Sequence, residues 1–154
     1  MSKFKDIMDT EYPGKWQSGL SALKDDGPPD HNNYTGRIKM TDRKPLEGSF
    51  FIEGYYKPRN RSANAENYWD YAIGYASCVY FVEIHEATTH GLDAVLAKFK
   101  WLKQNVRPKF SSMGNATFYV STSKPKFHDM SVSLRKLSQV GIKFRDRILE
   151  IPSN

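Results

Sequence analysis

Hydrophobic and polar residues alternate most clearly in the middle of the chain. Residues 79–85, Val-Tyr-Phe-Val-Glu-Ile-His, are rich in β-branched and aromatic side chains, which favour a strand. The unbroken apolar start of this segment predicts a central strand that is covered on both faces. Because side chains alternate between the two faces of a strand, Glu83 and His85 should point to the same side.

The segment that follows this strand has the spacing of an amphipathic helix. Its apolar residues recur at intervals of three or four, at Leu92, Val95, Leu96, Phe99 and Leu102. Thr88 and Thr89 stand where an N-cap belongs, and Pro108 follows the expected end of the helix near 105–106. The pattern therefore predicts a strand followed directly by a long helix.

Weaker patterns predict further elements on both sides of this pair. Strands are expected at 34–40, 49–56, 68–75, 116–121 and 142–151, and helical segments at 4–8, 16–23 and 130–140. No internal repeat interrupts this order. It predicts a single domain over residues 1–154, of α/β (α+β) class, with a central mixed β-sheet flanked by helices.

Composition narrows the class of protein. Hydrophobic residues make up 39% of the 154 residues and aromatic residues 14%, which argues for a folded domain rather than a disordered chain. Cys78 is the only cysteine, so an intramolecular disulfide is excluded. No apolar run approaches the length of a membrane span, so we expect a cytoplasmic protein without a membrane partner.

Acidic residues on neighbouring predicted strands suggest a metal site. Glu53, Asp70 and Glu83 lie in three successive predicted strands, at 49–56, 68–75 and 79–85. Converging carboxylates repel one another, and a hard divalent cation such as Mg²⁺ or Mn²⁺ relieves the repulsion while it polarises a phosphate oxygen. The alternative is that Glu83 and His85 simply emerge at a strand end and are solvated.

Basic residues point to a polyanionic partner. Lysine and arginine total 23 against 17 aspartate and glutamate residues, a formal net charge of +6. Cations beside aromatic rings suit a nucleic-acid backbone with unpaired bases, either DNA or RNA. The residues expected to contact nucleic acid are Lys57, Arg59, Arg61, Lys98 and Arg107. Charges on an amphipathic helix also form its ordinary solvated face.

The predicted order β-β-β-α-β over residues 49–121 resembles the PD-(D/E)xK nuclease superfamily. In that resemblance Asp70 corresponds to the single aspartate and Glu83 to the (D/E) position, while His85 falls where the lysine is expected. The resemblance implies a restriction-endonuclease-like sheet flanked by helices. It also implies one or two Mg²⁺ ions and the hydrolysis of phosphodiesters by an endonuclease, for which a homodimer would be reasonable.

His85 departs from this family pattern. An imidazole can hydrogen-bond a water molecule, act as a general base or bind a metal, but it supplies no permanent cation. Some relatives carry the lysine on the following helix, where Lys98, Lys100, Lys103 and Gln104 are available. We therefore expect His85 to orient water and Lys100 or Lys103 to contact the phosphate.

Three interpretations remain open from the sequence. The chain is a metal-dependent nuclease, or a catalytically inactive protein of the same fold that binds nucleic acid or a protein partner. In the third interpretation it is an unrelated α+β binding domain, in which Glu83-Ile84-His85 is incidental.

Overall fold

The fold was analysed in a computed structural model that describes residues 3–25, 34–57, 68–84, 89–122 and 131–152. Its centre is a six-stranded sheet in the order β1-β3-β4-β5-β6-β7. The strands are β1 (Trp16–Ser18), β3 (Leu46–Phe51), β4 (Tyr71–Tyr75), β5 (Cys78–Ile84), β6 (Ala116–Thr122) and β7 (Ile142–Asp146). A separate pair is formed by β2 (Ile38–Met40) and β8 (Leu149–Ile151).

The direction of pairing changes at β5. Strands β1, β3, β4 and β5 pair antiparallel, whereas β5, β6 and β7 pair parallel. Ala76 and Ser77 both have positive φ, 51° and 64°, which is the backbone of a tight turn between antiparallel strands. Parallel strands need a longer crossover, and helices α3 (Thr89–Asn105) and α4 (Ser131–Gln139) provide it. The prediction of a mixed sheet flanked by helices is confirmed.

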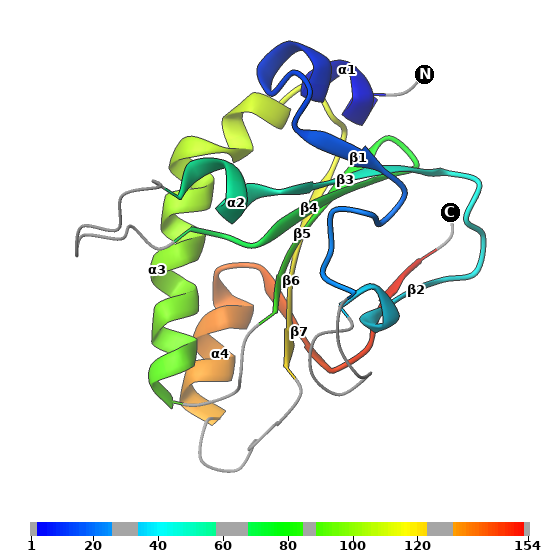
Figure 1. The fold of residues 1–154 in the computed structure, drawn as a ribbon. Helices are drawn as coiled ribbons and strands as arrows, with labels where there is room; N and C mark the ends of the chain where they lie inside the picture. Colours follow the sequence, from blue (N-terminus) through cyan, green and yellow to red (C-terminus); the bar gives the residue numbers. More distant parts are fainter. Residues whose placement is uncertain (1–2, 26–33, 58–67, 85–88, 123–130, 153–154) are drawn as a thin grey trace.

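The two faces of the sheet are covered by different structures (Figure 1). Helices α3 and α4 lie on one face, which we call the helical face, and α1 (Lys3–Glu11) packs at one end of it. On the opposite face lie the β2–β8 pair and the short η1 (Thr35–Arg37). Two further short elements are α2 (Ile52–Tyr56) and η2 (Arg107–Phe110).

Alternate residues of the strands supply two separate apolar clusters. Phe81 on β5 packs in the helical-face cluster with Phe4 of α1 and Phe99 of α3. Tyr80 and Val82, the neighbours of Phe81, belong to the opposite cluster. Strand β5 is therefore covered on both faces, as its apolar sequence predicts. Within the described residues, no helix combines the length and apolar composition needed to cross a membrane.

Two of the predicted strands are wrong in part. The strand expected at 49–56 ends at Phe51, and the chain then forms helix α2. Helical spacing directs Ile52 into the core and lets the Tyr56 ring contact the Trp101 ring, with centroids 4.9 Å apart. The strand expected at 142–151 is divided into β7 and β8, which belong to different sheets. The chain turns between them at Arg147, where φ is 62°.

The remaining differences lie near the N-terminus. Trp16–Ser18 forms the edge strand β1 where a helical turn was expected, because its backbone pairs with β3. The strand expected at 34–40 begins as the 3₁₀ turn η1, and only Ile38–Met40 pairs with β8. In both segments tertiary pairing decides the local structure.

Candidate active site

Asp70 and Glu83 face each other across two neighbouring strands. In the antiparallel ladder of β4 and β5, Tyr71 pairs with Val82, so the next position outward sets Asp70 opposite Glu83. Both residues alternate in phase with Phe81, which belongs to the helical-face cluster. The two carboxylates therefore project from the helical face at the end of β5.

Each carboxylate accepts a hydrogen bond from the backbone of the other strand. The Asp70 N–H donates to Glu83 Oε1 at 3.1 Å, and the Ile84 N–H donates to Asp70 Oδ2 at 3.0 Å. These reciprocal bonds extend the contact between the strands one step beyond β4. They hold both side chains in defined positions.

Helix α3 brings a lysine to these carboxylates. The Lys98 ammonium donates to Glu83 Oε2 at 2.6 Å, a charge-assisted bond of short length. The Glu83 side chain is 0% exposed and that of Lys98 is 15% exposed. We call this arrangement the Asp70–Glu83–Lys98 site.

The two carboxylates of the site carry more negative charge than the single Lys98 ammonium balances. Burial, followed by the negative charge of Glu83, raises the pKa of Asp70 well above its usual value, and Lys98 offsets only part of this effect. Burial alone would lower the pKa of Lys98, but the charges of Glu83 and Asp70 outweigh burial and raise it. Lys98 therefore stays protonated, and a further cation beside Asp70 would be electrostatically favoured.

Glu53 lies near this site but does not complete a cluster of three carboxylates. It occupies the first turn of α2, not a strand, and its carboxylate is 3.9 Å from the Lys57 ammonium. Its negative charge raises the pKa of both Asp70 and Lys98. Across the part of the chain that the structure describes, no three histidine, cysteine, aspartate or glutamate residues lie close enough together to hold a metal ion.

The structure places Lys98 at the carboxylates, rather than Lys100 or Lys103. Lys100 is exposed, and the Lys103 ammonium lies 5.2 Å from the centroid of the Phe99 ring. The sequence analysis counted Lys98 among the lysines available on this helix, but it chose Lys100 or Lys103 for the site and assigned Lys98 to nucleic-acid contact. The helical phase carried the signal, because Lys98 is three residues after Val95 and four before Leu102, both of which are buried.

The other predicted site residues are dispersed. Lys57 pairs with Glu53, and the partly buried Arg107 begins η2 beyond the end of α3. His85, Arg59 and Arg61 lie outside the described residues, so their roles stay predictions.

Comparison of the chain with protein-family models, with curated proteins and with solved structures gave no match. Function is therefore inferred from the chemistry of the Asp70–Glu83–Lys98 site itself. Two adjacent carboxylates can bind a hard divalent cation, and a neighbouring ammonium can bind an anionic group beside that cation. Such a pairing suits a phosphate ester.

Proposed function

We propose that this protein is a metal-dependent nuclease that hydrolyses nucleic-acid phosphodiesters. Asp70 and Glu83 are the acidic residues of a PD-(D/E)xK-like site, and Lys98 of α3 takes the role of the lysine. The observation that carries the proposal is the 2.6 Å contact between Lys98 Nζ and Glu83 Oε2, beside Asp70.

The arrangement of strands supports this assignment. Antiparallel β3, β4 and β5 are followed by α3 and by β6, which pairs parallel to β5. This is the β-β-β-α-β order that the family resemblance implies. The restriction-endonuclease-like architecture is therefore part of the proposal, with the lysine supplied by the helix that follows β5.

The donor set suits Mg²⁺ or Mn²⁺ even though it contains only two carboxylates. In phosphate-processing sites Mg²⁺ is usually held by one or two carboxylates, while water molecules and substrate oxygens complete its coordination. Asp70 and Glu83 would hold the ion, which when bound acts as a Lewis acid on the phosphate. Binding would also relieve the repulsion that raises the pKa of Asp70.

Lys98 is placed to serve the reaction while it remains bound to Glu83. An ammonium group has three N–H donors, and the contact with Glu83 uses one of them. A second donor can orient a water molecule or bind a phosphate oxygen, where the positive charge stabilises the negative charge that develops during hydrolysis. His85, two residues after Glu83, remains the proposed water-orienting base.

A second candidate is a catalytically inactive protein of the same fold that binds nucleic acid. The observation in its favour is the complete burial of Glu83, which is typical of a structural ion pair as well as of an active site. In this case Lys98 and Glu83 would only join α3 to the sheet.

Cleavage assays distinguish these two functions. End-labelled single- and double-stranded DNA and RNA would be incubated with the protein and Mg²⁺, Mn²⁺ or EDTA. We expect metal-dependent cleavage that falls by about 100-fold or more in Glu83→Gln and Lys98→Gln. Lys100→Gln is the matched control, because Lys100 is exposed on the same helix and should be dispensable.

Two results would contradict this proposal, one by rejecting the site and the other by rejecting the nuclease activity. Metal-dependent cleavage that persists unchanged in Glu83→Gln would show that the chemistry lies elsewhere. Salt-sensitive binding without cleavage of any of the four substrates would support the inactive, nucleic-acid-binding protein.

A further inference from the structure

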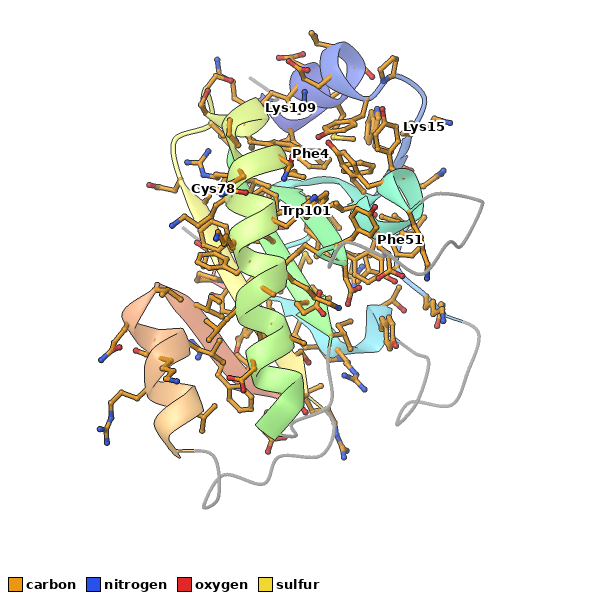
Figure 2. All side chains as sticks on the ribbon, turned by 90° about the vertical axis from the view of Figure 1, so that its left-hand side faces the viewer. Phe4, Lys15, Phe51, Cys78, Trp101 and Lys109 are labelled. Atoms are coloured by element: carbon orange, nitrogen blue, oxygen red, sulfur yellow. The ribbon has the colours of Figure 1, made fainter. Side chains whose placement is uncertain are left out.

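A pocket of about 420 Å³ opens beside α2, between Lys15 and the segment from Phe50 to Lys57. It is lined by Lys15, Phe50, Phe51, Gly54, Tyr55 and Lys57. Figure 2 shows Lys15 and Phe51 on the same flank of the molecule. The volume of the pocket falls within the range of small-molecule sites in proteins, so the pocket is large enough for part of a nucleotide.

Two aromatic rings at this pocket are unusually exposed. Phe51 is 37% exposed and Tyr55 is 45% exposed, and the two are among the four exposed large hydrophobic residues that the described chain contains. The other two, Val140 and Ile148, do not line the pocket. Exposed aromatic rings grouped at a pocket are typical of a binding site.

Packing holds these rings in position. Phe51 stacks on Tyr71, with ring centroids 5.2 Å apart and an angle of 28° between the planes. Gly54 makes room for the Phe51 ring, since a Cβ atom at that residue would lie 2.4 Å from a ring carbon. Tyr55 meets Tyr12 edge to face at 5.0 Å. Little ordering entropy would therefore be lost when a flat ligand stacks on these rings.

Positive charge borders the pocket, and one of its two lysines pairs with Glu53, which lies near the proposed active site. Lys15 and Lys57 both line it, and both are exposed. The Lys57 ammonium is 3.9 Å from the Glu53 carboxylate, whose charge acts on Asp70 and Lys98. Glu53 therefore lies close to a lysine of the pocket and close enough to the Asp70–Glu83–Lys98 site for its charge to act there.

We propose that this pocket binds an unpaired nucleotide of a nucleic-acid strand whose backbone reaches the Asp70–Glu83–Lys98 site. The base stacks on Phe51 or Tyr55, and Lys15 and Lys57 bind the neighbouring phosphates. Aromatic stacking beside cations is the general chemistry by which proteins bind single strands without reading their sequence. The inference rests on the proposed function and narrows its substrate to nucleic acid with an unpaired segment.

Fluorescence anisotropy tests the stacking. It measures, in EDTA, how tightly the protein binds a labelled single strand of about 12 nucleotides. Phe51→Leu and Tyr55→Leu keep apolar volume but remove the aromatic plane. The variant that removes the ring under the base should weaken binding about 10-fold, the loss expected for one stacked base. Ile148→Leu is the control, because Ile148 is exposed outside the pocket and should leave affinity unchanged.

The lysines provide a separate readout. Lys15→Gln and Lys57→Gln should each reduce the slope of log affinity against log salt by about 0.7, the value for one phosphate of a single strand. Lys136→Gln on α4 should leave the slope unchanged, since Lys136 is exposed outside the pocket. Thermal unfolding of every variant checks that the fold is retained.

A blunt duplex of the same sequence should be insensitive to Phe51→Leu, because its bases are already stacked. Wild-type affinity of both leucine variants for single-stranded DNA and RNA would overturn the proposal, as would an equal loss of duplex binding. Metal-dependent cleavage with normal binding by the leucine variants would reject this pocket alone. Ring-dependent binding without cleavage would support the pocket and reject the nuclease assignment.

Discussion

The two faces of strands β4 and β5 are built from alternate residues of the same short segments, yet their chemistry differs. On the opposite face, Tyr71 and Val82 continue an apolar and aromatic cluster that the β2–β8 pair covers. On the helical face, Phe81 is followed after one alternation by Glu83, and Asp70 stands across from it.

The apolar residues of the opposite face stabilise the fold, whereas the two carboxylates of the helical face cost it stability. A buried carboxylate costs free energy unless it is paired, and an apolar residue at the position of Glu83 would avoid that cost. The opposite face shows that the same strands accept apolar residues at neighbouring positions. A conflict with local packing rules on one face alone is typical of a functional site.

Removing the lysine should have the largest effect on stability. Lys98→Met leaves Glu83 buried without its counter-ion, so we expect the free energy of unfolding to fall by about 3 kcal/mol. Urea denaturation in EDTA measures this change. Lys100→Met, at an exposed position of the same helix, should change it by less than about 0.5 kcal/mol.

A double variant sharpens this prediction. If Lys98 stabilises the fold chiefly by balancing the charge of Glu83, then Lys98→Met combined with Glu83→Gln should lose less stability than Lys98→Met alone. Strictly additive losses would show that the two side chains act independently.

Asp70→Asn should stabilise the metal-free protein near neutral pH, because the asparagine places no charge in this buried site. Burial and the charge of Glu83 raise the pKa of Asp70 in the folded state, with a smaller contribution from Glu53 and an opposing one from Lys98. A raised pKa means that protonated Asp70 favours the folded state. This stabilisation is complete below the ordinary carboxyl pKa of about 4, and it is lost as the pH rises through the pKa that Asp70 has in the folded protein. The advantage of the asparagine variant should therefore be small in acid and should grow toward neutral pH.

Urea denaturation across this pH range, in EDTA, tests the sign of the effect. Asp93→Asn is the matched control, because Asp93 is exposed on α3. A loss of stability in Asp70→Asn at neutral pH, or a pH-independent difference from wild type, would contradict the electrostatic account of the site.

The opposite face should respond least to the loss of a polar group. The Tyr75 hydroxyl donates to the Asp42 carbonyl at 2.7 Å, and Asp42 belongs to an exposed segment where water can replace the donor. Tyr75→Phe should therefore lower the free energy of unfolding by at most about 1 kcal/mol. A loss as large as that of Lys98→Met would remove the contrast between the two faces.

Much of the sheet could be predicted because its central segments carry strong local patterns. The residues of β5 favour a strand in any context, and the apolar spacing of α3 is that of one helix face. The residues of α2 were misassigned because Phe51 and Ile52 continue a β-like composition. Only contacts with Tyr68 and Trp101 show why the chain turns there and directs Tyr56 toward α3.

The site was predictable to the same extent as the strands. Alternation and strand order suffice to bring Asp70 and Glu83 together, because antiparallel neighbours align by register. The choice among Lys98, Lys100 and Lys103 depends on the rotation of α3 about its axis. The buried neighbours Val95 and Leu102 reveal that rotation once the packed face is known.

Titration calorimetry with Mn²⁺ tests the metal site without any assumption about the substrate. We predict one Mn²⁺ per wild-type chain, with affinity reduced at least about 10-fold in Glu83→Gln and unchanged in Glu150→Gln, an exposed control. Lys98→Gln should bind Mn²⁺ at least as tightly as wild type, because the ammonium competes for the same carboxylates. Equal Mn²⁺ affinity in wild type and Glu83→Gln would contradict the assignment of Glu83 as a metal ligand.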